Sequence, residues 1–589
     1  MSALPIAIPE VTTAGGFLLV LALMLPFLGV LAALVLGGRN AQRVAFLTIP
    51  PGLALVVAIA VEAVQSGGKL VYILGGWVPP LGVALRADGL SVVMLLATAL
   101  IILAVAIYAR ADFPTPAGAD EGRAPLMFWT LLLAVWGSLN LIFLAGDLFT
   151  LYVALELLTF AGVPLVCLDG RPETLQAALR YLVYALIGSV LYMLGAVLLY
   201  GAYGTLDIAL LAQRVQPEPA AFVAAALMTA GLLAKTALFP LHLWLPPAHA
   251  GAPAAASAVL SALVVKGSWF LVVRLWFDVM PGVVTPAAAQ LLGALGAAAI
   301  LFGSIVALRQ ERLKLLVAYS TLAQIGYLFL MFPLAFDAAG NALGHGAALT
   351  GGLLQAVSHA TAKAAMFMAA GLIYAALGHD RIADLAGVGR AMPVTVLTFA
   401  LAGLALMGVV PSGAYLAKKL MLEAADGSGQ WWWAIVLQGG AAFTAGYVVL
   451  VLVSVLRRRS GAMPLVKPVS RLSELAALAL AMSSLLLALA ALGPVPGHLV
   501  SNPLAPKELG ALLAVVLGGA LLALGISRRP LLGTERADTG ANGGPLRRAA
   551  LAAGVAFERA DIHARRWPVA SMSLLCLALL FAALIVGGR

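Results

Sequence analysis

Five lysines lie inside stretches of the sequence that are otherwise apolar. Lys235, Lys266 and Lys363 are each near the middle of such a stretch. Lys418 and Lys419 are adjacent and lie near the end of another. A lysine at the centre of a membrane helix costs about 2.5–3.5 kcal/mol on insertion scales, so several in one chain need partners, water or a function. Amines that change protonation in place could relay protons.

One acidic residue also lies within an apolar span and could pair with one of these amines. Glu156, in GDLFTLYVALELLTFAGVPLV, is the one acid that we place deep within an apolar span. In general, burial lowers the pKa of a lysine by up to about 3–5 units, and an approaching carboxylate raises it again. A Glu156–Lys235 pair that closes and opens is therefore expected to hold a proton and then release it.

The histidines extend this pattern. His359 and Lys363 are four residues apart, so on a helix they share one face, and a histidine near its ordinary pKa of about 6.5 suits proton relay. His242 and His249 follow Pro240 at a spacing of seven residues. They either line a cytoplasmic access route or pack within a loop, and the sequence leaves both open. Lys419 is expected to extend towards lipid headgroups.

Composition restricts the class of protein. The chain of 589 residues is 63% hydrophobic and 10% charged, with a mean hydropathy of +1.04, which excludes a soluble globule. Cys167 and Cys576 are too far apart for a CxxC metal site, and we expect no metal, cofactor or nucleic acid partner. No P-loop or GxGxxG context is present, so ATP-driven transport is not expected.

Apolar stretches long enough to cross hydrocarbon predict an all-α polytopic membrane protein of about sixteen spans. They lie near 17–37, 44–65, 90–110, 126–145, 147–168, 176–203, 221–247, 253–277, 288–308, 313–334, 348–376, 394–420, 432–456, 473–493, 508–526 and 568–587. With the N-terminus outside, 24 of the 35 Lys and Arg residues fall in cytoplasmic segments, six in external segments and five within spans. Because basic residues are retained on the cytoplasmic side, both termini are predicted to be external.

The spans group into four parts. Pro240 follows Lys235, and Pro411 precedes Lys418, so an interrupted helix is expected fourth in each of two five-helix units. An odd number of spans per unit makes the two units inverted repeats. Residues 1–125 are predicted to form an N-terminal three-helix segment, with an external hairpin at 66–89. Residues 126–277 form the first repeat and residues 288–456 the second. Residues 457–589 form the C-terminal helices, with a basic cytoplasmic loop at 527–567 that includes a surface helix.

Several motifs between about residues 70 and 456 together resemble one family. They are LGGWVPPLGVALRADGLS, GDLFTLYVALELL, YLVYALIGSVLYMLG, AKTALFPLHLWLPPAHAGAPAAASAVLSALVVK, ERLKLLVAYSTLAQIGY, LLQAVSHATAKAAMF and PSGAYLAK. The chain resembles the antiporter-like membrane subunits shared by respiratory complex I, Mrp-type cation/proton antiporters and membrane-bound hydrogenases. The resemblance implies a proton relay through Glu156 of the fifth helix, Lys235 of the seventh, Lys266 of the eighth, His359 and Lys363 of the eleventh, and Lys418 of the twelfth near the external exit.

We therefore expect an ion-translocating subunit of a multisubunit assembly in the cytoplasmic membrane of a prokaryote. It would move protons, with Na⁺/H⁺ exchange as a variant, while any redox chemistry sits on a partner chain. A stand-alone transporter of an organic or anionic solute is the alternative, with the lysines clustered around one pocket. An inert scaffold subunit is the third reading.

Overall fold

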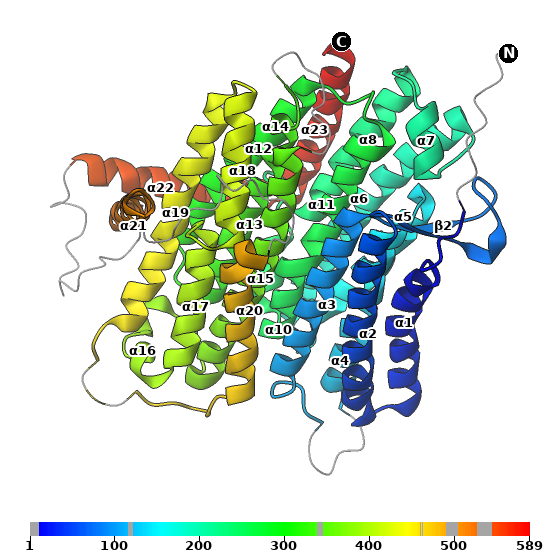
Figure 1. The fold of residues 1–589 in the computed structure, drawn as a ribbon. Helices are drawn as coiled ribbons and strands as arrows, with labels where there is room; N and C mark the ends of the chain where they lie inside the picture. The colour runs from blue at the N-terminus through cyan, green and yellow to red at the C-terminus, as the bar shows by residue number, and fades with distance from the viewer. Residues whose placement is uncertain are drawn as a thin grey trace.

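The computed structural model describes residues 11–115, 122–337, 346–459, 461, 463–490, 505–526 and 545–588. Most of the described helices lie side by side along one direction (Figure 1). Among the described residues, fifteen helices are long and apolar enough to cross a membrane. The remaining predicted span, 394–420, which is twelfth along the chain, is divided between the two shorter helices α17 (Pro393–Leu406) and α18 (Gly413–Gly427). The predicted all-α polytopic fold with interrupted helices is confirmed.

The N-terminal part forms one edge of the bundle (Figure 1). Its elements are α1 (Phe17–Leu36), α2 (Asn40–Gln65), β1 (Leu70–Ile73), the 3₁₀ turn η1 (Leu74–Gly76), β2 (Ala84–Ala87) and α3 (Gly89–Ala109). The strands pair antiparallel, with Leu70 opposite Ala87, within the segment predicted as a hairpin. Arg86 fastens this hairpin to the bundle, because its guanidinium donates to Asp207 Oδ2 at 2.8 Å.

The next set of elements contains the first interruption. It comprises α4 (Arg123–Leu144), α5 (Leu148–Val166), α6 (Pro172–Tyr203), α7 (Ile208–Arg214), α8 (Pro219–Thr236), α9 (Leu245–Gly251), α10 (Ala254–Val259), the π-helical η2 (Leu260–Val264), α11 (Val265–Arg274) and the π-helical η3 (Leu275–Val279). The predicted span 221–247 stops being helical at Thr236. Pro240 explains why it does not resume at once, since proline lacks the backbone N–H and clashes with the preceding turn.

A second interruption follows in the other half of the chain. The elements are α12 (Pro286–Leu308), α13 (Leu313–Phe329), α14 (Met331–Leu334), α15 (Ala347–Leu377), η4 (Ile382–Asp384), α16 (Val388–Ala391), α17, α18 and α19 (Trp431–Leu456). Gly408 leaves the helical region with φ of 75°, and Pro411 lies in the break. The Ser412 side chain then starts α18 by accepting a hydrogen bond from Tyr415 N at 3.1 Å.

Four helices complete the chain: α20 (Arg471–Ala490), α21 (Pro506–Ile526), α22 (Pro545–Ala564) and α23 (Trp567–Gly587). Figure 1 shows α21 close to end-on, so this helix crosses the direction of α19 and α20. Helix α20 packs on α3, α15 and α17, while α23 packs on α8 and α12. Helix α22 corresponds to the predicted surface helix, and residues 527–544 of the predicted loop lie outside the described residues.

Glycine pairs bring neighbouring helices together in both predicted repeats. A Cβ on Gly231 of α8 would lie 2.3 Å from the Gly188 carbonyl oxygen of α6. A Cβ on Gly326 of α13 would lie equally close, at 2.3 Å, to the Gly296 carbonyl oxygen of α12. Membrane helices associate through close backbone packing at small residues, because lipid offers no hydrophobic driving force. These contacts hold the helices that carry the buried polar groups.

Candidate functional site

Glu156 and Lys235 meet in the interior, between α5, α6 and α8. The Nζ atom of Lys235 lies 3.6 Å from Glu156 Oε1, and it donates hydrogen bonds to Thr159 Oγ1 at 2.9 Å and Ser189 Oγ at 2.6 Å. A distance of 3.6 Å joins the charges without a hydrogen bond. Neither carboxylate oxygen of Glu156 has a hydrogen-bond partner among the described residues. Buried oxygens in that situation are typical of sites completed by water.

The end of α8 places Lys235 at the first interruption. Lys235 is the next-to-last residue of the helix, where the unsatisfied carbonyls and the helix dipole favour a positive charge. Ala237 follows in the left-handed region with φ of 60°, which ends the helix. Trp244 Nε1 donates to the Ala234 carbonyl at 3.0 Å and so occupies one acceptor of the last turn. A rearrangement of this break would act directly on the amine.

A short polar connection leads from Lys235 towards Lys266. A small cavity of about 10 Å³ is lined by Lys235, Thr159 and Ser268, which is close to the space that one water needs. Thr236 Oγ1 donates to Ser268 Oγ at 3.0 Å. Ser268 lies two residues after Lys266 on α11. Hydroxyl groups and room for about one water thus lie between α8 and α11, the helices that carry the two lysines.

Lys266 is fully buried and is held by backbone rather than by an acid. Its Nζ donates to the Ser261 carbonyl at 2.6 Å. Ser261 lies in the π-helical turn η2, where the backbone hydrogen-bond pattern is altered from that of an α-helix. The Ser261 hydroxyl in turn lies 2.9 Å from Thr321 Oγ1 of α13. The chain of polar groups thus passes from α11 to α13.

Lys363 and His359 continue this chain on α15. Lys363 Nζ donates to Ser320 Oγ, and Ser320 is the immediate neighbour of Thr321. The ammonium also lies 5.8 Å from the centre of the Tyr447 ring. His359 is one turn earlier and fully buried, and neither ring nitrogen has a hydrogen-bond partner among the described residues. The expected relay pair therefore lies in the interior, and the His359 ring nitrogens are buried there without a hydrogen bond to a described residue.

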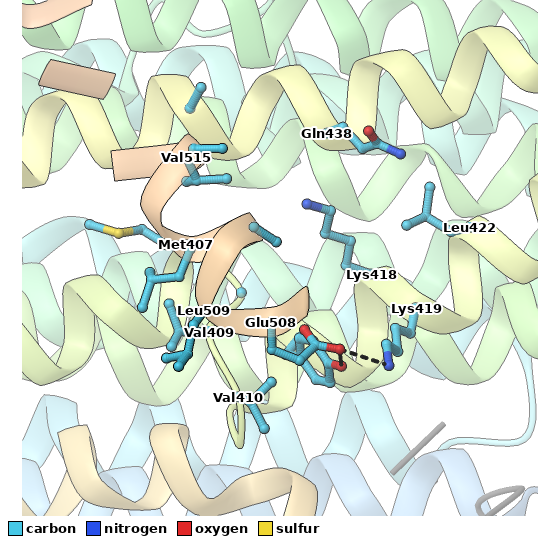
Figure 2. Close-up of a pocket in the computed structure, with 16 residues that line it drawn as sticks. Met407, Val409, Val410, Lys418, Lys419, Leu422, Gln438, Glu508, Leu509 and Val515 are labelled. Atoms are coloured by element: carbon cyan, nitrogen blue, oxygen red, sulfur yellow. Dashed lines mark hydrogen bonds and ion pairs between the residues drawn. The ribbon is translucent and has the colours of Figure 1, made fainter. Parts of the chain in front are cut away.

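Lys418 lies beyond the second interruption and faces a pocket. The cavity, of about 650 Å³, lies between α18, α19 and α21. Figure 2 shows the Lys418 side chain extending into the pocket, away from the Glu508–Lys419 pair. Helix α18 contacts α15 near the relay pair, because the Ala414 N–H donates to Ser358 Oγ at 3.0 Å and Ser358 adjoins His359.

The two remaining histidines have different surroundings. His242 Nε2 lies 3.0 Å from Asp561 Oδ1 of α22, so it joins the first interruption to the C-terminal part of the chain. His249 stacks on Phe367, with ring centres 4.7 Å apart, and neither of its ring nitrogens has a hydrogen-bond partner among the described residues. Both are fully buried. His249 lies next to Ala250, Gly251 and Ala252, which line a pocket of about 780 Å³ at the helix ends.

Several of the partners were not predicted from the sequence. The hydroxyls of Thr159, Ser189, Ser261 and Ser320 accompany the lysines, and only their position within apolar spans could have indicated them. One basic residue assigned to a cytoplasmic segment is also buried in the protein. Lys314 is 7% exposed and donates to the Ala252 carbonyl, because it lies one residue inside α13.

Two basic residues near predicted external ends of spans have acidic partners. Arg274, placed in an external segment, ends α11 and donates to Asp88 Oδ2 at 2.5 Å and to Asp278 Oδ2 at 2.7 Å. Lys419, expected to extend towards the headgroups, lies 3.5 Å from Glu508 Oε1 of α21. In both cases an acid from a distant segment holds the cation, which span length cannot reveal.

Comparisons with known proteins show the family to which the chain belongs. Residues 145–444 match the family model described as NADH:quinone oxidoreductase/Mrp antiporter, TM. The chain is 35% identical over 410 residues to the N subunit of the NADH-quinone oxidoreductase of Desulforudis audaxviator, covering 67% of this chain and 79% of the relative. It is 26% identical over 422 residues to the D subunit of the Na⁺/H⁺ antiporter of Bacillus subtilis, covering 71% and 82%.

The chain belongs to the NADH:quinone oxidoreductase/Mrp antiporter family of membrane proteins. Solved structures share the fold. The Mrp complex from Dietzia sp. DQ12-45-1b contains a chain with a TM-score of 0.70 and 23% identity, covering 86% of this chain and 97% of that one. An archaeal membrane-bound sulfane sulfur reductase contains another with a TM-score of 0.71 and 24% identity, covering 86% and 99%. The range that matches the family model includes Glu156 and Lys418 and the predicted relay residues between them, whereas Glu508, α22 and α23 lie beyond it.

Proposed function

We propose that this chain translocates protons across a membrane as one subunit of a larger assembly, using Glu156, Lys235, Lys266, His359, Lys363 and Lys418. The observation that carries the proposal is the series of buried polar groups on α13 and on the helices that carry Lys235, Lys266 and Lys363. Hydrogen bonds of 2.5–3.0 Å join Thr236 to Ser268, Lys266 to the Ser261 carbonyl, Ser261 to Thr321 and Lys363 to Ser320, and there is room for about one water beside Lys235.

The Glu156–Lys235 contact acts as the switch in this scheme. The lysine is favoured in its charged form while the carboxylate is close, and it gives up the proton more readily when the pair separates. The absence of a hydrogen bond at 3.6 Å lets the pair separate without breaking one. Helix α8 ends directly after Lys235, so movement of the break is a means of separating the charges.

Protons are taken up on the cytoplasmic side and released outside in this proposal. The pocket of about 780 Å³ beside His249 is lined by Asp169, Arg171 and Lys314, which belong to predicted cytoplasmic segments. The orientation is supported at the two described ends of the chain. Thr13 N donates to the carbonyl of Val71 in the predicted external hairpin at 2.9 Å, and Thr285 Oγ1, in the predicted external loop, donates to the Leu584 carbonyl at 3.1 Å.

Moving one charge against the membrane potential costs about 2.3 kcal/mol per 100 mV, so outward pumping needs an energy source. We place that source on partner subunits of a prokaryotic cytoplasmic membrane assembly. The relatives named above are designated as subunits, which gives no support to a stand-alone solute transporter. The cavity beside Lys235 is also too small for an organic solute, at about 10 Å³. Na⁺/H⁺ exchange stays open, since one relative carries that name.

The test uses the assembly purified with its partner subunits and reconstituted in liposomes. Lys235→Ala and Lys266→Ala are each expected to lower proton flux at least about tenfold, because a positioned proton-transfer group typically contributes that much or more. Lys69→Ala, which removes an exposed lysine near the hairpin, is the matched control and should retain full flux. Sodium flux measured in parallel shows whether exchange depends on the same residues. Unchanged proton flux in both buried variants would leave the inert-scaffold reading standing.

A further inference from the structure

The pocket beside Lys418 contains an acid that comes from outside the range that matches the family model. Three charged residues line this cavity of about 650 Å³, namely Lys418, Lys419 and Glu508. Glu508 lies in the first turn of α21, which packs on α19. An acid in the first turn of a helix is favoured as a carboxylate, because the positive end of the helix dipole is close. Most of the other lining residues are apolar, so this carboxylate is not part of a charged surface.

Specific contacts hold the Glu508 carboxylate in place. Its Oε1 accepts a hydrogen bond from the Tyr415 hydroxyl at 2.8 Å and lies 3.5 Å from Lys419 Nζ. The same ammonium lies 4.8 Å from the centre of the Tyr415 ring. Figure 2 shows Glu508 and Lys419 turned towards each other across the pocket. The side chain of Glu508 is 16% exposed, so the carboxylate is fixed at the pocket wall with limited access to solvent.

The adjacent lysines have different roles in this geometry. Lys419 is the counter-charge of Glu508, whereas the Lys418 amine lines the same cavity away from this pair (Figure 2). One carboxylate and two ammonium groups leave one positive charge in excess among the lining residues. Since Lys419 is engaged by the acid, the proton on Lys418 is the one that can leave. At about 30 Å³ per water, the cavity has room for on the order of twenty waters to carry it.

We propose that Glu508 is the terminal carboxylate of the exit path, accepting the proton that Lys418 releases and passing it to the external side. This inference rests on the proposed function. In the step, the Lys418 ammonium becomes a neutral amine while the Glu508 carboxylate becomes a carboxylic acid. The acid then gives the same proton to external water and returns to a carboxylate. The amine is recharged from the buried relay, so charge and protons balance over each cycle.

The experiment compares Glu508→Gln with Glu508→Asp in the reconstituted assembly, with Lys235→Ala as a marker of the relay itself. Glu508→Gln keeps the size of the side chain but cannot accept a proton, and it should lower proton flux about tenfold or more. Glu508→Asp keeps the acid and should restore at least half of the flux. The wild type should also slow when the external solution is acidified, because the acceptor is then protonated from outside, and Glu508→Gln should lose this dependence.

The outcomes separate this inference from the proposed function. If Lys235→Ala is inactive while Glu508→Gln keeps flux within twofold of the wild type, only the role of Glu508 is overturned. If both variants translocate normally, both proposals fail. If Glu508→Asp loses as much flux as Glu508→Gln in a normally assembled complex, titration is not the role and the inference fails.

A further variant serves if Glu508→Gln does not assemble. Lys419→Met removes the counter-charge and leaves the acid, so the dependence on external pH should move to higher pH, since a carboxylate loses ionised character without its positive neighbour. An unmoved pH profile in Lys419→Met overturns the proposal.

Discussion

At the scale of single residues, the buried amines are distinguished by what accepts their hydrogen bonds. Lys266 is bound by a carbonyl and Lys363 by a serine hydroxyl, and both partners are neutral. Lys235 has an acid nearby, but its hydrogen bonds go to Thr159 and Ser189. A buried lysine locked in an ion pair would keep its proton, whereas neutral oxygen partners stabilise the ammonium by less. The arrangement therefore suits groups that must gain and lose a proton repeatedly.

Removal of one neutral acceptor tests this interpretation. In Ser320→Ala the ammonium of Lys363 loses its hydroxyl partner. Hydrogen bonds to charged groups contribute about 1.5–3 kcal/mol, and about 1.4 kcal/mol corresponds to a factor of ten, so proton flux should fall about tenfold. Ser454→Ala on α19, where the hydroxyl donates to the Leu450 carbonyl of its own helix at 2.8 Å, is the control. Equal flux in the two variants would remove Ser320 from the relay.

At the scale of helices, the first interruption is tied to a helix far along the chain. Asp561 of α22 lies 3.0 Å from His242 Nε2 and 2.7 Å from the Tyr319 hydroxyl of α13, and Arg565 pairs with it from the next turn. Beside this contact, Glu558 accepts a hydrogen bond from Arg309 at 3.0 Å. Two carboxylates of α22 thus fix the end of α12 and the break that follows Lys235.

The pKa of Asp561 gives this contact a pH dependence. Burial raises the pKa of the carboxyl, but the hydrogen bond from His242, the charge of Arg565 and the Tyr319 hydroxyl outweigh it, and the pKa lies below its ordinary value. Stabilisation from a carboxyl with a lowered pKa is complete above its unfolded pKa of about 3.9, and it is lost as the pH falls through the lower folded value.

Asp561→Asn should therefore destabilise the assembly by about 3 kcal/mol at neutral pH, the order of cost of breaking a buried pair. The difference from the wild type should shrink as the pH falls below about 4. Thermal unfolding followed between pH 3 and pH 7 measures both effects. Asp384→Asn, which alters an exposed acid, serves as the control. Curves for wild type and Asp561→Asn that stay parallel at every pH would show that this carboxyl contributes no linked stability.

At the scale of the whole molecule, the C-terminal helices connect the two predicted repeats. Helix α20 packs against α3 of the N-terminal part and against α15 and α17, and α23 returns to α8 and α12. Helix α21 packs on α19 at the edge of the bundle and brings Glu508 to the pocket beside Lys418 (Figure 1). The part of the chain beyond the family match therefore reaches both interruptions, through Asp561 at the first and Glu508 at the second.

The predicted orientation is testable by labelling single cysteines. Cys167 and Cys576 are first replaced by serine, and a cysteine is then placed at Ser66 beside the hairpin or at Arg458 after α19, both exposed positions. An impermeant maleimide should label Ser66→Cys in intact cells and Arg458→Cys only after the cells are permeabilised. Basic residues are retained on the cytoplasmic side, which is why Arg458 should be protected. The reverse labelling pattern would invert the proposed direction of proton movement.

The spans and the buried lysines could be predicted from the sequence, because the requirement for about twenty apolar residues and the cost of a central charge are both local properties. Pro240 and Pro411 likewise marked the interruptions, since a missing backbone donor acts on its own helix. The partners could not be predicted in this way. Ser320 meets Lys363, Asp561 meets His242 and Glu508 meets Lys419 only because helices distant in sequence pack in one register. Hydropathy does not encode that register, so the tertiary structure alone decided which oxygen stands beside each amine.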